Sequence, residues 1–371
     1  MSKNSLKCNM TEQVTINDFD KIALLGKGSC GKVYLVKHKK TNYPYAMKVL
    51  NKHKRKTLNH ALTERKILMN MKYPFISSLY FCFQTELNLY IVMQFCAGGD
   101  FYSVIRRQPH KCLTESQTKY YSSCILLALE YLHFNGIIYR DLKPENILMH
   151  ESGHIMLTDF DLSICSNKVI PRIVTKPYSR CSGVCMEPDI ESDDWVGTPE
   201  YMAPEIVEGK HYNCCVDWWS FGILIFEMLY SESPFCGENL NKTFQLIQKC
   251  HLEFPSNHTP YDISSKVKNL IKHLLIHEPE KRLGFAGGST EIKDHPFFKD
   301  VEFQLLRNET PPIIPELSGP LDTHYFDNVE HCDQIEDKSN VINPETLGDE
   351  NIWKAFNNIN RVDSNPCLIK N

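Results

Sequence analysis

The sequence lacks the features that mark membrane, secreted and repeat proteins. Its longest strongly apolar stretch, Phe221 to Tyr230, contains Glu227 and is too short to span a bilayer. The polar N-terminus shows no apolar signal-peptide segment, and no internal repeat of solenoid length is present. We therefore expect a cytoplasmic protein without a transmembrane segment, with the nucleus as the alternative compartment.

The chain also lacks an excess of charge and a paired cysteine motif. Its 371 residues carry 41 Lys and Arg against 45 Asp and Glu, a formal net charge of −4, so charge gives no reason to expect a nucleic-acid partner. Fifteen cysteines are scattered along the chain, and Cys214-Cys215 and Cys181-x-x-x-Cys185 lack the CxxC spacing of a zinc site. We expect free thiols, a reducing compartment and a monomer.

The first third of the chain has the pattern of strands interrupted by one helix. Short apolar runs recur from Phe19 to Phe95. Between them, apolar side chains from Leu58 to Met69 recur at intervals of three and four residues, the period of a helix, and Pro74 ends the pattern. The run Ala97-Gly98-Gly99 follows, where a two-lobed protein would hinge.

The rest of the chain is mostly helical. Thr114-x-x-Gln117 fits a capping box that opens a helix closing at Gly136. Asp217 to Tyr230 is apolar almost all round, which is typical of a helix buried in the centre of a lobe. Residues 166–193 break the pattern with three prolines and no periodicity, basic residues preceding acidic ones, and a Pro-rich extended tail begins beyond Phe298.

Gly26-Lys27-Gly28-Ser29-Cys30-Gly31 reads G-x-G-x-x-G, a weak signal by itself. A Walker A loop needs Ser or Thr after its Lys, but Val33 follows Lys32. A Rossmann loop opens a helix, whereas the β-branched and aromatic run Val33 to Val36 favours a strand. The loop is therefore a hairpin. Its backbone either approaches phosphates or, as the open alternative, simply turns the chain.

A spaced set of charged residues favours the phosphate reading. Lys48 comes seventeen residues after Gly31, and Glu64 lies sixteen residues further on, on the expected helix. A Lys on an inward strand position is costly to bury unless a carboxylate pairs with it, and Glu64 is placed to do so. The run Tyr139–Asn146 follows, and Asp159-Phe160-Asp161 begins thirteen residues after Asn146.

Phosphoryl transfer needs a triphosphate that is held, charge that is neutralised by metal, and a positioned hydroxyl. We expect Asp141 to accept and orient the substrate hydroxyl. Asn146 and Asp159 offer the hard oxygen ligands that Mg²⁺ prefers. Lys48 would hold the α- and β-phosphates of ATP, and Lys143 the γ-phosphate.

In order, type and spacing these residues match the signature set of protein kinases. Val196–Glu205 resembles the P+1 loop and APE motif of that family, Asp217–Gly222 its central buried helix, and Arg282 the arginine that pairs with the APE glutamate, here Glu205. Thr198, which the resemblance expects to bond Asp141 and Lys143, is the serine/threonine-kinase form. A pseudokinase, the alternative from another class, is disfavoured because Lys48, Asp141, Asn146 and Asp159 are all present.

The resemblance covers residues 19–298 and implies an α+β, bilobal protein-kinase fold. The N-lobe would span 19–96 with an antiparallel sheet and one key helix, and the mostly helical C-lobe 97–298, with an activation-segment insert at about 166–193. Residues 1–18 would be disordered, and 299–371 would form an extended C-terminal tail. ATP is the implied phosphoryl donor and Mg²⁺ the implied cofactor.

The resemblance also implies which residues meet the nucleotide. The catalytic residues are Lys48, Glu64, Asp141 and Lys143, and the metal ligands are Asn146 and Asp159. The nucleotide-binding residues come from the glycine loop, the strands around it, the hinge and the tail: Leu25, Gly26, Lys27, Gly28, Ser29, Cys30, Gly31, Val33, Ala46, Lys48, Met93, Gln94, Cys96, Asp100, Leu148 and Phe326.

Finer features resemble the AGC group of kinases. Phe19-Asp20-Lys21-Ile22 precedes the loop, and Tyr139 stands where most kinases have His. Pro311–Pro315 resembles the proline motif of the AGC tail, and Asp322–Asp327 the segment that folds over the adenosine. Trp353-x-x-Phe356 is a poor match to the terminal hydrophobic motif, and a stray apolar pair is the alternative. An upstream kinase acting on the tail is an implied partner.

AGC kinases favour basic residues ahead of the target Ser or Thr, read by carboxylates at three places. Those places hold Asp100, Glu145 and Glu227 here, and a guanidinium suits such carboxylates through charge-assisted hydrogen bonds. We therefore expect protein substrates with Arg upstream, at the third residue before the target.

Two departures bear on regulation. Asp161 stands where most kinases have glycine, and Asp-Phe-Asp with a long insert resembles the plant phototropin branch and its fungal flippase-kinase relatives. The usual activation-loop phosphosite falls at Asp194, whose carboxylate would pair with Arg140 in place of a phosphate. We hypothesise that no activation-loop phosphorylation is needed, with a phosphorylated Ser192 as the alternative. The insert is either a targeting or autoinhibitory element or a plain solvated loop.

Overall fold

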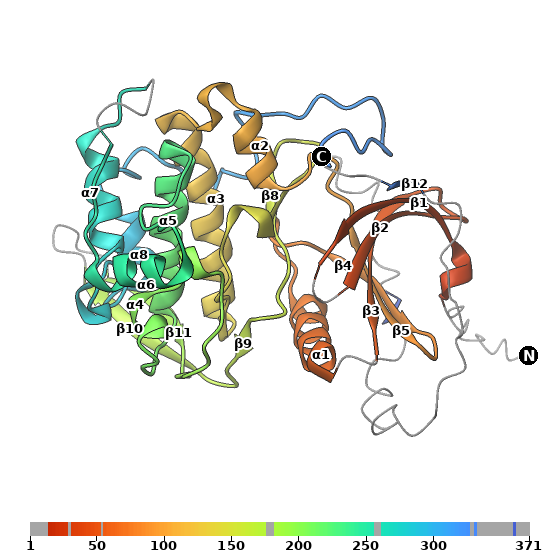
Figure 1. Ribbon diagram of the computed structural model, residues 1–371, viewed down its shortest axis with the longest axis horizontal. Coiled ribbons are helices and arrows are strands. Elements are labelled where there is room, and N and C mark those ends of the chain that lie inside the picture. The colour runs from red at the N-terminus through yellow and green to blue at the C-terminus, as the bar shows by residue number, and fades with distance from the viewer. Residues whose placement is uncertain are drawn as a thin grey trace, which may run out of the picture. The chain divides into compact units, whose positions relative to one another are not determined.

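The computed structural model describes residues 14–28, 31–52, 55–175, 182–255, 261–326, 330–331 and 359–360. Within them the chain forms two compact units (Figure 1). The first holds the chain through Met69, Ser78–Phe95 and the two short strands near the C-terminal end, and the second holds Asn70–Ser77 and Cys96–Phe326. An antiparallel sheet characterises the first unit and helices the second, so the expected α+β class is confirmed.

The first unit is built on one antiparallel sheet with strand order β12-β1-β2-β3-β5-β4-β13. Its elements are β1 (Phe19–Lys27), β2 (Gly31–His38), β3 (Pro44–Asn51), α1 (Arg55–Asn70), β4 (Leu79–Gln84), β5 (Asn88–Gln94), β12 (Glu330–His331) and β13 (Ile359–Asn360). Aromatic side chains, among them Phe19, Tyr45, Phe83 and Tyr90, form a buried cluster on this sheet. Burial of such rings is the main favourable term in its folding.

The chain is ordered from Val14, although the sequence pattern assigned residues 1–18 to a disordered terminus; residues 1–13 lie outside the described ranges. Ile16–Asp18 forms the short 3₁₀ helix η1, and Thr15 and Asp18 cap it reciprocally. Val14 and Ile16 pack against the aromatic cluster of the first unit. This apolar contact offsets the entropy that a polar terminus otherwise keeps.

The second unit is mainly helical. Its longer elements are α2 (Phe101–Arg107), α3 (Glu115–Phe134), α4 (Pro204–Val207), α5 (Cys215–Tyr230), α6 (Leu240–Lys249), α7 (Ser265–Leu274) and α8 (Gly288–Lys293). Thr114 and Gln117 form the expected capping box, and α3 ends two residues before Gly136. Every residue of α5 is buried, as its all-round apolar pattern predicted.

Short elements connect these helices. The pairs β6 (Ile137–Ile138) with β9 (Ile164–Cys165) and β7 (Ile147–Met149) with β8 (Ile155–Leu157) form two small antiparallel ladders. The 3₁₀ turns η2 (Pro109–Lys111), η3 (Pro144–Asn146), η4 (Pro199–Tyr201) and η5 (Pro279–Lys281) each begin with proline. Proline suits the first position of a helix because its missing N–H has no partner there.

The insert has regular structure, which its sequence pattern did not indicate. Strands β10 (Val169–Thr175) and β11 (Ser182–Pro188) pair in antiparallel register from Val169↔Pro188 to Thr175↔Ser182. Strand β11 packs against α3 and α8. The β-branched residues of β10 favour a strand, but the pairing that stabilises it is made with residues across the loop, which local periodicity does not reveal.

The first part of the tail belongs to the second unit. The hydroxyl of Tyr121 on α3 accepts a hydrogen bond from the Ile313 N–H at 3.2 Å. A Cβ on Gly153 would lie 2.3 Å from the Ile313 carbonyl oxygen, so only glycine fits beside the tail there. Further on, Arg107 donates to the His324 carbonyl and lies over the Tyr325 ring. No helix among the described residues is long and apolar enough to cross a membrane.

Candidate active site

A hydrogen-bonded cluster surrounds Asp141 in the loop between β6 and η3. The Thr198 hydroxyl donates to Asp141 Oδ1 at 2.8 Å, and Lys143 Nζ lies 2.9 Å from Asp141 Oδ2 and 2.7 Å from Thr198 Oγ1. The Asn146 amide nitrogen donates to Asp141 Oδ2 at 2.7 Å and to its backbone carbonyl at 2.9 Å. The structure thus brings together the carboxylate, the cation and the threonine that the sequence pattern singled out.

The loop before Asp141 is anchored by Asp217 of α5. The Asp217 side chain is fully buried. Its two carboxylate oxygens accept the backbone N–H groups of Tyr139 at 2.9 Å and Arg140 at 2.8 Å. His133 Nε2 of α3 lies 2.7 Å from the same carboxylate. Arg140 has a φ of 68°, and these bonds stabilise that unfavourable backbone. The sequence pattern gave Asp217 no such role, although a carboxylate in a largely apolar helix was a usable signal.

The two candidate metal ligands lie at the same end of the β7–β8 hairpin. Asn146 directly precedes β7, and Thr158, which follows β8, donates its N–H to the Asn146 carbonyl at 3.0 Å. Asp159 comes next and has a φ of 57°. The Asn146 amide nitrogen is bonded to Asp141, so its oxygen is the donor that a cation would use. An amide oxygen beside a carboxylate fits Mg²⁺.

Behind this pair, the ring of Phe160 packs edge-on against Tyr139, with centroids 5.3 Å apart, and both rings are fully buried. The Tyr139 hydroxyl donates to the Thr158 carbonyl. Complete burial, with Asp141 and Asp159 nearby, raises the pKa of Tyr139 well above its ordinary value, so this hydroxyl keeps its proton. Tyr139, standing where most kinases have His, therefore joins the loop of Asp141 to the Asp159 turn.

In the first unit, Lys48 on β3 and Glu64 on α1 form the expected ion pair. Lys48 Nζ lies 2.8 Å from Glu64 Oε2, and both side chains are buried. Strand β3 pairs with both β2 and β5, so Lys48 lies in the middle of the sheet, opposite Val33 and Ile91. A buried charge of this kind is retained because its partner compensates the desolvation of both groups.

The glycine loop is a β-hairpin, as the pattern after Gly31 predicted. The ladder runs to Lys27↔Lys32, and the Gly28 N–H donates to the Gly31 carbonyl at 2.9 Å. A Cβ on Gly31 would lie 2.2 Å from the Val49 carbonyl oxygen, whereas one on Gly26 or Gly28 would meet nothing within 4 Å. Gly31 is thus required by packing, and the other two leave the backbone open. The hairpin rules out a Rossmann or Walker A loop.

The remaining candidate nucleotide-binding residues divide between the two units. Those of the first unit include Leu25, Val33, Ala46, Met93 and Gln94, with Ala46 directly opposite Met93 in the sheet. Those of the second unit are Cys96, Asp100, Leu148 and Phe326. Asp100 and Leu148 form an antiparallel bridge, and the Phe326 N–H donates to the Thr323 carbonyl at 3.0 Å. Ser29, Cys30, Trp353 and Phe356 lie outside the described residues.

Asp194 pairs with Arg140, as the count back from Thr198 predicted. Arg140 Nη1 lies 2.8 Å from Asp194 Oδ2, and Arg140 is buried while Asp194 is half exposed. The same nitrogen donates to the Ser192 hydroxyl at 3.2 Å and to the Tyr212 hydroxyl at 3.0 Å. The hydrogen bond from Arg140 lowers the pKa of Asp194, so the carboxylate is charged at neutral pH.

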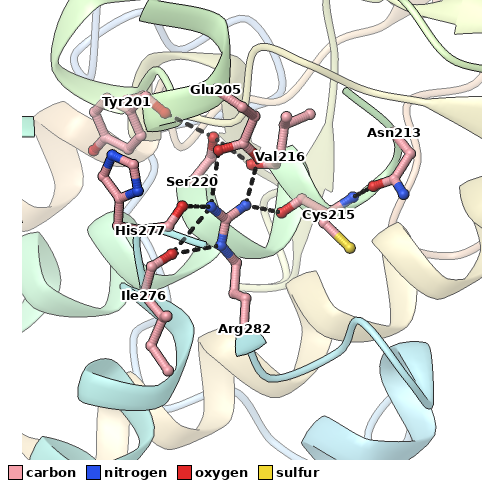
Figure 2. Close-up of polar contacts among 9 residues, drawn as sticks. All are labelled: Tyr201, Glu205, Asn213, Cys215, Val216, Ser220, Ile276, His277 and Arg282. Carbon is pink, nitrogen blue, oxygen red and sulfur yellow. Dashed lines mark hydrogen bonds and ion pairs between the residues drawn. The ribbon is translucent and has the colours of Figure 1, made fainter. Parts of the chain in front are cut away.

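The pairing of Arg282 with Glu205 is also confirmed (Figure 2). The guanidinium grips the carboxylate with two bonds, Nη1 to Oε1 at 2.7 Å and Nη2 to Oε2 at 2.9 Å. It also donates to the carbonyls of Cys215 at 3.0 Å and Ile276 at 3.1 Å. Both side chains are almost fully buried. Because Glu205 is the second residue of α4, this clamp fixes the segment that follows Thr198 to the core of the second unit.

The three carboxylates expected to read basic substrates all belong to the second unit. Asp100 caps α2 through the Ser103 N–H at 2.8 Å. Glu227 of α5 is buried and accepts a hydrogen bond from the Tyr201 hydroxyl. Burial raises the pKa of Glu227 and of Glu145. The Glu145 carboxylate raises the pKa of Glu227 further, and the carboxylates of Asp100 and Asp141 raise that of Glu145. A bound cation relieves such repulsion between carboxylates.

Residues 19–298 match the family profile described as protein kinase domain. The chain is 43% identical to Serine/threonine-protein kinase nrc-2 of Neurospora crassa over 90% of this chain and 55% of that protein. It is 47% identical to Flippase kinase 1 of Saccharomyces cerevisiae over 81% of this chain and 34% of that protein. It is 39% identical to Phototropin-2 of Oryza sativa subsp. japonica over 84% of this chain and 35% of that protein. The chain therefore spans between 34% and 55% of the length of these relatives.

Proposed function

The chain belongs to the protein kinase family, and on that premise we propose that it is an active serine/threonine kinase. It would transfer the γ-phosphoryl group of ATP to Ser and Thr hydroxyls of proteins. The observation that carries this proposal is the cluster of Asp141, Lys143 and Thr198, in which one carboxylate, one cation and one hydroxyl lie within 2.9 Å of their partners.

Each residue of the cluster has a defined task in the proposed reaction. Asp141 accepts the proton of the substrate hydroxyl and orients its oxygen toward phosphorus. Lys143 places a positive charge beside that oxygen, where negative charge accumulates in the transition state. Thr198 holds both side chains, so that neither has to reorganise as the phosphoryl group moves. Preorganisation of this kind is the main contribution that a protein makes to phosphoryl transfer.

Each unit carries candidate nucleotide-binding residues of its own. Lys48, oriented by Glu64, would bind the α- and β-phosphates, and the open backbone at Gly26 and Gly28 would approach the phosphate chain. Asn146 and Asp159 would hold Mg²⁺, which supplies charge neutralisation of the phosphates when it is bound. Phe326 and the other candidate nucleotide-binding residues named above would line the adenosine.

The deciding experiment is phosphate transfer from labelled ATP to an Arg-containing peptide. The wild type is compared with Asp159→Ala and Asp141→Asn, and thermal unfolding checks that all three proteins are folded. We expect both variants to lose at least ~100-fold in rate, because each loses a group required for metal binding or hydroxyl positioning. Equal incorporation by wild type and Asp159→Ala would overturn the assignment as an active kinase.

We propose further that the substrates carry Arg at the third residue before the target. The negative charge is supplied by three carboxylates, those of Asp100, Glu145 and Glu227. The raised pKa values of the two glutamates support this proposal, because a guanidinium would relieve the repulsion that these carboxylates feel from their acidic neighbours. Glu227→Gln keeps the size of the side chain and removes the charge. We expect it to lower kcat/KM for an Arg peptide roughly 10- to 100-fold, the effect of one charge-assisted hydrogen bond.

The same change at the exposed Glu253 serves as the control for this test. The Ala-substituted peptide should be phosphorylated equally by wild type and Glu227→Gln, because neither then has a guanidinium to bind. The preference should also weaken as pH falls, since carboxyls with raised pKa values take up protons earlier than ordinary ones. A peptide array that shows no loss when this Arg becomes Ala would end the idea.

Four further assignments are part of the proposal. The thiols of Cys82, Cys124, Cys214 and Cys250 are free, which supports a reducing compartment such as the cytoplasm or nucleus. The protein would act as a monomer, with an upstream kinase modifying its C-terminal tail. The Asp194–Arg140 pair supports activity without phosphorylation of the activation segment.

A further inference from the structure

A pocket lies in the second unit where the insert meets α3, on elements that the proposed reaction does not use. Its volume is about 220 Å³. Glu130, Tyr131, His133 and Phe134 from the end of α3 line it together with Ser289 of α8 and Tyr73, and Cys185 and Met186 of β11 complete it. Because Cys185 and Met186 both lie on β11, the insert takes part in forming the pocket.

Most of the lining is apolar or aromatic. The rings of Tyr73 and Tyr131 are stacked with centroids 4.4 Å apart and planes 10° from parallel. Phe134 is 57% exposed, unusually high for a phenylalanine, and it borders the same pocket. A flat ring placed against these side chains buries apolar surface on both partners, and ring-on-ring contacts add to that gain.

The pocket also offers polar atoms of defined character. The Glu130 carboxylate accepts hydrogen bonds from the Ser289 hydroxyl at 2.7 Å and from the Lys293 ammonium. Lys293 therefore neutralises Glu130, so the pocket does not call for a charged ligand. A carboxylate oxygen still has lone pairs for one more donor. Burial and the neighbouring Glu130 raise the pKa of Tyr73 to about 12, so its hydroxyl keeps its proton at neutral pH.

Size limits what the pocket can hold. A dry cavity of about 150 Å³ binds one benzene ring, whereas drug-sized ligands occupy clefts of roughly 300 Å³ or more. A volume of about 220 Å³ therefore accommodates one substituted ring or two fused rings. A pocket of that size binds one compact molecule, whereas a bound peptide would require several adjacent pockets for its successive side chains.

We propose that this pocket is a second ligand site, for a free, neutral small molecule of one or two fused rings that carries a hydrogen-bond donor, as in a phenol or an indole. The donor bonds to the Glu130 carboxylate, and the ring lies against the aromatic side chains. Because Cys185 and Met186 supply one wall, the ligand binds only when β11 lies against α3. The free energy of ligand binding therefore stabilises the arrangement in which β11 is packed on α3.

The site also has a direct connection to the catalytic loop. His133 lines the pocket, and its Nε2 lies 2.7 Å from Asp217, the residue that holds the backbone of Tyr139 and Arg140. A ligand that contacts the His133 ring thus touches the first member of a chain of hydrogen bonds that ends one residue before Asp141.

The proposal is tested by titrating the 371-residue chain with 4-fluorophenol, observed by fluorine NMR. A ligand of this size in a preformed pocket should bind with a Kd of roughly 1 mM. Met186→Trp fills the pocket and should weaken binding at least ~10-fold, whereas Met186→Leu keeps the volume and should bind as the wild type does. Leu305→Trp adds the same ring at an exposed position and should have no effect. Fluorobenzene, which lacks the donor, should bind several-fold more weakly.

A second measurement uses the unmodified protein, so it does not depend on the folding of a variant. In protein with ¹³C-labelled methionine methyl groups, the Met186 signal is assigned by its absence from Met186→Leu. It should shift with 4-fluorophenol along a saturable curve, and the signal of Met47, buried in the first unit, should not move. Absence of saturable binding up to ~10 mM, or binding that persists in Met186→Trp, would overturn the proposal.

Discussion

Replacing Arg282 with methionine should destabilise the second unit severely. The substitution keeps a long apolar side chain and removes the guanidinium, which is 1% exposed. Glu205, 3% exposed, would then be a buried carboxylate without its cation, and the Cys215 and Ile276 carbonyls would each lose a donor. The lost interactions include two direct charge-assisted bonds, at 2.7 and 2.9 Å.

The magnitude follows from the burial of both groups. Breaking a buried ion pair by removing one partner costs about 3–5 kcal/mol, because the remaining charge is desolvated without compensation. In a unit of roughly 240 residues, 1 kcal/mol shifts the melting temperature by about 2–4 °C. We therefore expect Arg282→Met to melt about 6–20 °C below the wild type. Thermal unfolding followed by far-ultraviolet circular dichroism measures this shift.

Two variants separate the buried pair from a general effect of the change. Lys281→Met makes the same kind of substitution at the neighbouring residue, whose side chain is 71% exposed and whose amine lies 3.8 Å from Glu278. It should shift the melting temperature by less than ~2 °C. Arg282→Met combined with Glu205→Leu removes both charges and should recover part of the loss. The reasoning is refuted if Arg282→Met melts like Lys281→Met, or if the double variant loses as much as the two single changes together.

Three other perturbations have clear expected outcomes. Thr198→Val keeps the shape of the side chain but loses the hydroxyl between Asp141 and Lys143, so kcat should fall roughly 10- to 100-fold in a peptide assay while Thr198→Ser stays near wild type. Asp194→Asn should lower kcat several-fold and phosphatase treatment of the wild type should not, and the opposite pair of results would identify a phosphosite as the ordering group. Gly31→Ala should cost about 1–3 kcal/mol in chemical denaturation because of its clash with a backbone oxygen, whereas Gly28→Ala should be tolerated.

Much of the site was predictable from the sequence because phosphoryl transfer needs few residue types at fixed spacings. The ion pair of Lys48 with Glu64, the bonds of Thr198 and the clamp on Glu205 are all present as expected. The likeness to the phototropin and flippase-kinase branch is confirmed, because relatives of both kinds match the chain. The resemblance to the kinase signature supplied the pairing of distant motifs here, as for Arg282 and Glu205, which lie 77 positions apart.

The features that the sequence did not reveal depend on contacts between distant segments. The insert gave no periodic signal, yet it forms the β10–β11 ladder and packs against α3 and α8. Asp217 was placed in a buried helix, but its bonds to Tyr139 and Arg140 join residues more than seventy positions apart. The order from Val14 likewise arises from packing on an aromatic cluster whose strands come later in the chain.

The activation segment is held at several points by contacts that need no phosphate. Strand β9 pairs with β6 at its start, β11 packs on α3 and α8, and Ser192 exchanges two backbone hydrogen bonds of 2.9 Å with Tyr212 near its end. The Asp194–Arg140 pair adds a charge contact at the position where the resemblance to other kinases predicts a phosphate. Each of these contacts lies within the second unit, so the segment is ordered by the fold that surrounds it.

The chemistry of that charge contact distinguishes it from a phosphate. A phosphate group loses charge as pH falls through about 6. The pKa of Asp194 lies below its ordinary value because the Arg140 hydrogen bond stabilises the carboxylate, so the pair contributes its stability above the ordinary aspartate pKa of about 3.9 and loses it only as pH falls through the lowered value. Resistance of the activation segment to proteolysis should therefore not change between pH 7.5 and 5. A loss of resistance near pH 6 would mean that a phosphorylated Ser192, and not Asp194, holds Arg140.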